Sequence, residues 1–278
     1  MKLHQYHIVV PTRCTPVSIF PAACVHKDDP GHSESHWKAY LKEVKETPHS
    51  YAVFLGDYFT WLRTHAREWV RHYPHDENSF EAMHDWRHER TAEFVKDLIP
   101  IKDRIIGMHV GNHNHLYPDG SNDTMEMCRL LGVTYLEKVA ITRLMFSVAQ
   151  RPVHKVLTML TLHGDGIGGG STAGGDINAM INKGMPWDVD VVILAHNHQK
   201  NSVQTVHLSV PHRGTLKLIE KPRVFIRCGC FVRGYTEGCT TYAERNLLKP
   251  TAIGHSRLDI LFRETKDNIV RCDFKVTA

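Results

Sequence analysis

An apolar run passes directly into metal-ligand side chains over residues 104–115, Arg104-Ile105-Ile106-Gly107-Met108-His109-Val110-Gly111-Asn112-His113-Asn114-His115. The apolar part is typical of a buried β-strand, and the polar part begins where that strand would end. Four other predicted strands end alike, in Cys24-Val25-His26, Gly56-Asp57, His163-Gly164-Asp165 and His196-Asn197-His198. Open α/β sheets gather their sites at the carboxyl ends of strands, so we expect these side chains to meet at one rim.

Apolar runs and amphipathic stretches alternate over the first two thirds of the chain. Buried strands are predicted at 51–55, 104–110, 156–162 and 189–195, and helices at 34–46 and from about Asn78 to Leu98. This order predicts a layered α/β fold. From about Val203 only strands are predicted, at 203–210, 216–219, 224–230, 257–262 and 269–274, so a second, more antiparallel sheet is expected. With no linker or repeat, residues 1–278 are interpreted as a single domain.

The composition is that of a globular chain, 278 residues with 42% hydrophobic and 23% charged side chains. No apolar run approaches the roughly 18 residues of a membrane span, and the start does not resemble a signal peptide, so we expect a cytoplasmic protein that binds no membrane. The seven cysteines, an odd and scattered set, are expected to be thiols. A net charge of +4 is too small to indicate nucleic acid by itself, but 21 histidines indicate metal binding.

An Asp, an Asn and several His at one rim supply enough oxygen and nitrogen donors for two divalent ions about 3.5–4 Å apart. A bridging carboxylate can hold both ions, which lower the pKa of a shared water and clamp phosphate oxygens. The pattern therefore favours phosphoryl chemistry. A single His at a strand end is more often a structural, hydrogen-bonded residue, and the prediction depends on five strand ends agreeing.

In combination and order these motifs resemble the calcineurin-like metallophosphoesterases. The pattern of that family is D-x-H, G-D-x-x-[D/E/N], G-N-H-[D/E], a lone His and G-H-x-H, and the resemblance runs from about Ala23 to His198. Residues 230–256 and the glycine-rich segment after His163 also resemble bacterial and bacteriophage members. The resemblance implies a four-layer α/β/β/α sandwich of two mixed sheets.

The resemblance also implies two divalent metal ions, Mn, Zn or Fe, and a role for each matching residue. The ligands that it assigns are His26 and His198 for the first metal, and Asn112, His163 and His196 for the second. Asp57 would bridge the two ions. His113 would act on the phosphate as the general acid, or as a charge that steadies the leaving oxygen; the alternative is a structural residue that orients a ligand.

Cys24 occupies the position at which the family has an aspartate. As a thiolate ligand it would favour a softer metal, Zn or Fe(II), at the first site. As a small buried hydrophobic residue it would leave that site weak or empty. A third possibility is that Asp28 or Asp29 supplies the missing carboxylate.

Thr60 and Asn114 replace two acidic residues that orient ligands in the family. Such changes lower metal affinity by roughly 10–100-fold. Together with Cys24, these replacements leave open another interpretation, in which the chain is a scaffold or binding protein that has the fold but little catalytic activity. The near-complete set of second-metal ligands, Asn112, His163 and His196, argues against that alternative.

Two further features are candidates for binding a phosphate-ester substrate. The segment 164–175 has seven glycines, and Gly168 and Gly169 could present backbone N–H groups to a phosphate, or the segment is a mobile loop. Arg63, Arg67 and Arg71 form a basic stripe after Asp57 that could steer a polyanion, although a solvated helix face is the more usual explanation.

The sequence therefore predicts a metal-dependent phosphoric ester hydrolase. The preferred reaction is phosphodiester hydrolysis of a nucleic acid or nucleotide by a metal-activated hydroxide. A phosphomonoesterase acting on a nucleotide or phosphoprotein is the alternative within enzymes.

Overall fold

Two mixed β-sheets lie face to face in the computed structural model, which describes residues 1–61, 77–168, 173–210, 216, 218–245, 247, 249–265 and 270–277. The first sheet runs in the order β1 (Lys2–Val10), β5 (Val139–Val148), β6 (Val153–Leu162), β7 (Val191–Leu194), β9 (Ile219–Cys230) and β10 (Gly254–His255), with β8 (Lys200–Ser209) paired to β9. The second runs β12 (Val270–Thr277), β11 (Arg257–Glu264), β2 (Val17–Ala22), β3 (Ser50–Phe54) and β4 (Ile105–Met108).

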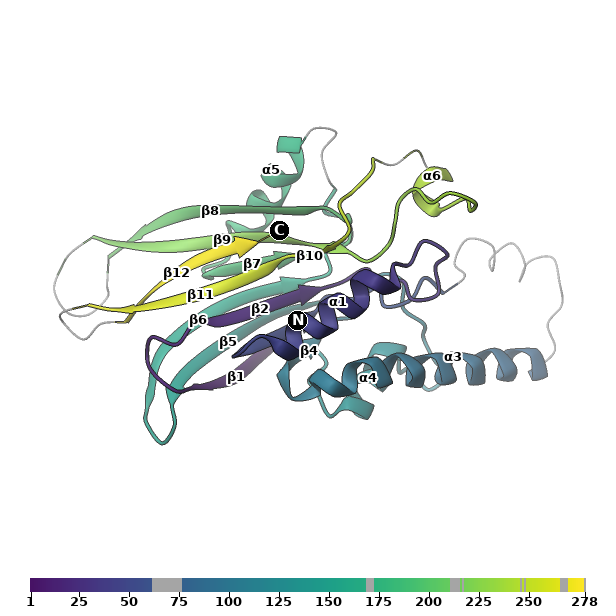
Figure 1. Cartoon of the computed structure of the whole chain (residues 1–278), viewed down its shortest axis with the longest axis horizontal. Helices are drawn as coiled ribbons and strands as arrows, with labels where there is room; N and C mark the ends of the chain where they lie inside the picture. The colour runs from purple at the N-terminus through teal and green to yellow at the C-terminus, as the bar shows by residue number, and fades with distance from the viewer. Residues whose placement is uncertain are drawn as a thin grey trace.

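Helices cover the outer face of each sheet (Figure 1). The described helices are α1 (Glu34–Glu46), α3 (Glu77–Leu98), η1 (Ile99–Arg104), α4 (Asp123–Leu131), α5 (Ala173–Gly184) and α6 (Tyr242–Arg245). Helix α1 buries Trp37, Tyr40 and Val44, which recur at the helical period. The side chain of Asn122 caps α4 by accepting the N–H of Met125 at 2.8 Å. None of these helices has the length and apolar character needed to cross a bilayer.

Three apolar clusters separate the layers. The central cluster fills the space between the sheets, with side chains such as Leu144 and Ile193 from one sheet and Ile19 and Ile260 from the other. A second cluster packs α1, α3 and α4 against the second sheet, and a third packs α5 against the first. The predicted four-layer α/β/β/α sandwich of two mixed sheets is therefore confirmed.

Parallel pairing aligns the strand ends that carry the candidate ligands. Ala22 pairs with Phe54 and Phe54 with Met108, so β2, β3 and β4 end side by side. In the other sheet Leu162 pairs with Leu194, so β6 and β7 also end together. All five predicted polar segments follow these ends.

The prediction for the last third of the chain is wrong in its topology. The late strands do not form a sheet of their own: β8, β9 and β10 complete the first sheet, and β11 and β12 complete the second. Of the predicted strand 216–219, residues 216 and 218 lie outside any strand, residue 217 lies outside the described residues, and Ile219 begins β9. Strands β1 and β5, which pair in parallel, were not predicted. The expected strands 104–110 and 189–195 are shorter in the structure, where β4 is Ile105–Met108 and β7 is Val191–Leu194.

Candidate metal centre

Five of the seven predicted metal ligands have a left-handed backbone. The φ angles are 51° at Cys24, 45° at His26, 57° at Asp57, 74° at His196 and 61° at His198. Residues other than glycine adopt this region at a cost of order 1–3 kcal/mol each, and such positions cluster at functional sites. The turns after β2, β3 and β7 therefore hold these side chains in directions that ordinary strand backbone would not give them.

Four donor atoms converge at the predicted second-metal position. The His163 Nε2 atom lies 2.9 Å from Asn112 Oδ1 and 3.0 Å from Asp57 Oδ2. The His196 Nδ1 atom lies 2.9 Å from Asn112 Oδ1 and 3.2 Å from His163 Nε2. Ligand atoms about 2.0–2.1 Å from a tetrahedral Zn²⁺ are about 3.3 Å apart, so this spacing is close to that of a small divalent site.

The tautomer of His163 also fits a cation. Its Nδ1–H donates to the carbonyl oxygen of Leu55 at 2.6 Å, so its Nε2 atom is the one that faces the Asp57 and Asn112 oxygens. Burial lowers the pKa of His163, but the hydrogen bond and charge of Asp57 outweigh burial and raise the pKa above its ordinary value. Acceptors that face one another in a buried place require a proton or a cation between them. The donor set thus matches a divalent ion.

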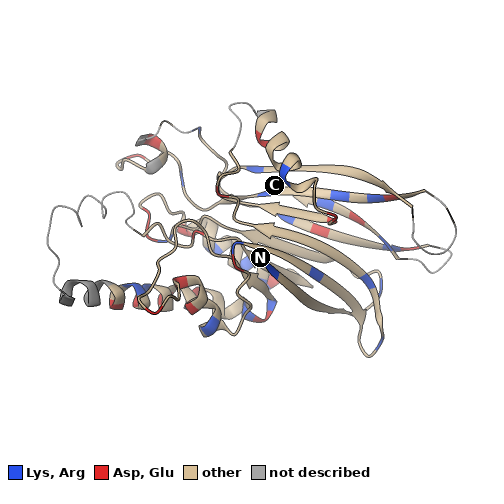
Figure 2. Cartoon of the chain, turned by 180° about the vertical axis from the view of Figure 1, so that it is seen from behind, with Lys and Arg blue, Asp and Glu red and all other residues tan. Residues whose placement is uncertain are grey.

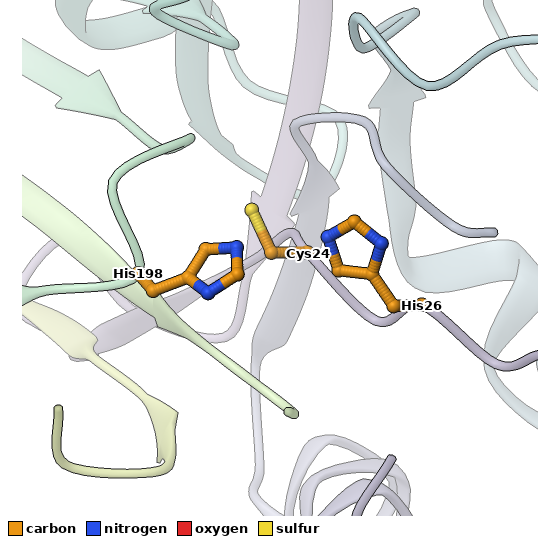
Figure 3. Close-up of side chains that lie close together, drawn as sticks. All are labelled: Cys24, His26 and His198. Carbon is orange, nitrogen blue, oxygen red and sulfur yellow. The ribbon is translucent and has the colours of Figure 1, made fainter. Parts of the chain in front are cut away.

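Cys24, His26 and His198 form a second group, whose ligand atoms all lie within 4.8 Å of one another. The two imidazole rings flank the Cys24 thiol (Figure 3). The Nε2 atom of His26 is buried and has no hydrogen-bond partner among the described residues. This group therefore corresponds to the predicted first site, with a buried imidazole nitrogen available to it as a ligand.

Asp57 lies between the two groups. Its Oδ2 atom is 3.0 Å from His163 Nε2 and 4.0 Å from His26 Nε2, and its Oδ1 atom accepts the backbone N–H of His113 at 2.8 Å. Burial raises the pKa of this carboxyl, but the hydrogen bond and charge of His163, together with His26 and His113, outweigh burial and hold the pKa below its ordinary value. Asp57 is therefore a carboxylate, placed where one group can face both sites.

Three of the surrounding imidazoles, His26, His196 and His198, have lowered pKa values and are neutral near pH 7. Burial lowers the pKa of His26, and it lowers that of His198 to about 4. Burial and then His163 lower the pKa of His196. Metal binding requires unprotonated imidazole, so these rings offer lone pairs without first losing a proton. Burial, followed by the Asp57 charge, raises the pKa of Cys24, so its sulfur is a thiol unless a cation stabilises the thiolate.

Thr60 anchors two histidines at once. Its Oγ1 atom is 3.0 Å from His26 Nδ1, and its carbonyl oxygen accepts the Nδ1–H of His113 at 3.1 Å. The ring of His26 is thereby oriented by a hydroxyl where the family pattern has an acid. The same contacts leave Nε2 as the free nitrogen of His113, beside the His26 ring at a centroid distance of 5.2 Å.

The structure does not bring Asp28 or Asp29 into the cluster, so the suggestion that either replaces the missing carboxylate is wrong. The Asp28 oxygens accept the N–H groups of Thr60 at 2.6 Å and Trp61 at 3.0 Å. Asp29 Oδ1 accepts the N–H of Gly31 at 2.7 Å. Both carboxylates shape the loops on which the ligands lie.

Most of the predicted substrate-binding residues lie outside the part of the chain that the structure describes. Arg63, Arg67, Arg71 and Gly169 lie outside the described residues. Gly168 is exposed, with open space at the position of a Cβ atom. In Figure 2 Lys and Arg are interspersed with Asp and Glu along the drawn helices and strands.

Gly111 is a further residue of the site, in contact with Asp57, and was not among the predicted site residues. A Cβ atom there would lie 2.0 Å from Asp57 Oδ1 and 2.4 Å from the Asp57 nitrogen. Only a residue without a side chain lets the loop after β4 pass against Asp57. The glycine in the Gly111-Asn112-His113 motif is the signal that was available.

We expect Gly111→Ala to displace Asp57 and weaken metal binding. Overpacking of this kind lowers the free energy of unfolding by about 1–3 kcal/mol. Urea denaturation and elemental analysis of the purified protein measure the two effects. Gly174→Ala, on a part of α5 with open space around it, is the control; a Gly111→Ala protein that matches this control in metal content would contradict the role given to the contact.

Comparison with known proteins yields structural likeness only. No protein-family model matches the sequence, and no curated protein matches it. Three solved structures that match are Vps29 from Chaetomium thermophilum (11% identity, 94% of this chain and 96% of that chain, TM-score 0.37), Vps29 from Entamoeba histolytica complexed with Zn²⁺ (9%, 94% and 99%, 0.40) and a predicted phosphoesterase from Streptococcus pneumoniae (10%, 95% and 99%, 0.35). Strand pairing and the packing of the layers, rather than this likeness, define the fold.

Proposed function

We propose that the chain is a calcineurin-like metallophosphoesterase that hydrolyses phosphate esters with two divalent metal ions. The observation that carries the proposal is the convergence of Asp57, Asn112, His163 and His196, whose donor atoms lie 2.9–3.2 Å apart in successive contacts. These residues come from four strand ends in two sheets, so local chain geometry does not explain their meeting. The order of their motifs supports the same family.

The residues of the chain would divide the chemistry among them. Divalent ions held here would supply a hydroxide near neutral pH and neutralise charge on the phosphate. Asp57 would hold both ions, since it is ionised and faces both groups. His113 is fixed through its Nδ1–H by the Thr60 carbonyl, so a proton on its Nε2 atom would be the one delivered to the leaving oxygen.

We propose Zn²⁺ or Fe²⁺ for the first site. Cys24 is fully buried, and its sulfur lies within 4.8 Å of ligand atoms of His26 and His198, and also of Asp57 and His163. A thiolate prefers these metals to Mg²⁺ or Mn²⁺. The alternative in which Cys24 merely packs in the core predicts no dependence of metal content on its sulfur.

Replacing Cys24 by Ala is expected to lower the metal content from about two ions per chain to one, because the first site would keep only its imidazoles and a shared carboxylate. Elemental analysis by mass spectrometry measures the change. Cys228→Ala, another buried thiol of the same core, is the matched control. An unchanged zinc and iron content in the Cys24→Ala protein would discard the thiolate ligand.

A phosphodiester, in a nucleic acid or nucleotide, is the substrate class that we propose. The glycine-rich segment after His163 and the basic stripe at Arg63 and Arg67 support it. Bis(p-nitrophenyl) phosphate and p-nitrophenyl phosphate compare a diester with a monoester in one assay, with and without EDTA. Faster, EDTA-sensitive release of p-nitrophenol from the diester is expected; preference for the monoester would reverse the substrate class, and no turnover with two ions bound would favour a binding protein.

A further inference from the structure

A buried ion pair lies behind the His196-Asn197-His198 turn. Arg227, on β9, and Asp176, in the first turn of α5, are both fully buried, with Arg227 Nε 3.2 Å from Asp176 Oδ1. A guanidinium and a carboxylate withdrawn from water need partners for their remaining polar atoms. The hydrogen-bond partners of Arg227 and Asp176 show which parts of the chain the ion pair holds in place.

Arg227 joins the two loops that carry the second-metal imidazoles. One terminal nitrogen of its guanidinium donates to the carbonyl of Ala195 at 2.8 Å, and the other donates to the carbonyl of Ile167 at 3.4 Å. Ala195 directly precedes His196, and Ile167 lies four residues beyond His163. Charge-assisted hydrogen bonds are roughly twice as strong as neutral ones, so the guanidinium holds the Ala195 carbonyl strongly and the Ile167 carbonyl, at the longer distance, more weakly.

Asp176 holds the same turn from its other side. Its Oδ1 atom accepts from the Asn197 side chain at 2.5 Å, and its Oδ2 atom accepts from the Asn201 side chain at 2.8 Å. Asn197 lies between the two candidate ligands His196 and His198. The ion pair therefore contacts the turn at two places, at Ala195 before His196 and at Asn197 between His196 and His198.

The turn needs such support because of its backbone. Both His196 and His198 have positive φ angles, and strained residues keep such conformations only where their surroundings over-determine them. Within the turn itself the N–H of Asn197 donates to Ala195 at 3.0 Å, and the N–H of Gln199 donates to the Asn197 side chain at 3.3 Å. The contacts from Arg227 and Asp176 fix the position of the turn relative to the sheet and to α5.

We propose that Asp176 and Arg227 are positioning residues that set the metal affinity of His196 and His198, although neither touches a metal. This inference rests on the proposed metal centre. It also links the start of α5, directly after the glycine-rich segment, to the ligands of both ions. Loss of an outer partner of a metal ligand typically weakens metal binding by about 10–100-fold.

The test is a titration of metal-free protein with Co²⁺, followed by the visible absorption of bound Co²⁺ and by calorimetry. Asp176→Asn keeps the shape of the side chain but removes its charge. We expect Co²⁺ affinity to fall by about 10–100-fold with an altered absorption spectrum. Asn197→Ala, which leaves the ion pair intact and removes its contact with the turn, is expected to weaken binding in the same direction.

Asp190→Asn is the matched control. Asp190 immediately precedes β7, at the opposite end from His196, and its carboxylate accepts the N–H and hydroxyl of Thr158 at 2.7 and 2.9 Å. This variant should lose stability but keep wild-type Co²⁺ affinity. Circular dichroism confirms folding for every variant, and if Asp176→Asn does not fold, the result for Asn197→Ala decides.

The outcomes separate the two proposals. A wild-type chain that binds no Co²⁺ would refute the metal centre itself. A wild-type chain that binds two ions, with folded Asp176→Asn and Asn197→Ala proteins of equal affinity and spectrum, would refute only the positioning role. Equal weakening in Asp190→Asn would also refute it, because the effect would then follow from general destabilisation.

Discussion

Asp57→Asn is expected to give a folded protein with at most one bound ion per chain and almost no phosphoesterase activity. Asparagine has the shape of aspartate, and its carbonyl oxygen can still accept the N–H of His113, but it lacks the charge that faces both metal sites. Ions that clamp a phosphate supply several kcal/mol of transition-state stabilisation. Because each 1.36 kcal/mol changes the rate tenfold, kcat should fall by about a thousandfold or more.

Elemental analysis and steady-state hydrolysis of bis(p-nitrophenyl) phosphate measure these two losses. Asp259→Asn is the control, since Asp259 lies in the same sheet, where β11 pairs with Ser18 at the opposite end of β2. Two ions and near-normal kcat in the Asp57→Asn protein would show that this carboxylate does not bridge. The phosphoesterase proposal would then lose its main support.

His113→Ala is expected to lower kcat by about 10²–10⁴-fold while both ions stay bound, as is usual when a general acid is removed. Metal binding should persist because the contact between residue 113 and Asp57 uses the backbone N–H, which alanine retains. The imidazole is anchored by its Nδ1–H to the Thr60 carbonyl, so its removal leaves the ligand set in place.

The leaving group distinguishes an acid from a residue that merely orients a ligand. A p-nitrophenolate departs without a proton, whereas an alkoxide needs one. The loss in the His113→Ala protein should therefore be much larger for an alkyl diester than for bis(p-nitrophenyl) phosphate. Equal losses on both substrates, or a fall in metal content, would remove the acid role from His113.

The layers of the fold were predictable because a buried helix face or strand produces a local pattern of apolar residues in the sequence. Trp37, Tyr40 and Val44 recur at the period of a helix, and the short apolar runs before Asp57 and His196 have the length of buried strands. The choice of pairing partner produces no such local pattern. Nothing near Val224 or Leu258 in the sequence indicates that β9 pairs with β7 and β11 with β2, so the late strands were assigned to a sheet of their own.

Meeting of the candidate ligands was predictable for a different reason. Parallel strands bring their carboxyl ends to one rim, so residue type at a strand end carries most of the information. Side-chain hydrogen bonds within loops carry no comparable signal. The choice between Cys24 and Asp28 depended on such contacts, and Asp28 binds the N–H groups of Thr60 and Trp61 rather than entering the cluster. The support from Arg227 was equally invisible, since it comes from a residue 31 positions beyond His196.

Folding and metal binding make opposite demands on the backbone of five residues. A left-handed conformation is unfavourable for folding but directs the donor side chains into the candidate site at Cys24, His26, Asp57, His196 and His198. Glycine adopts such angles without steric penalty, so the backbone conformation alone would favour glycine at each position. The chain has donor side chains there instead, which is the trade-off between activity and stability expected where a site demands a particular geometry. Glycine at one of these positions should therefore relieve the local backbone strain but remove a donor atom, so the five residues are where the geometry of the candidate site costs the scaffold stability.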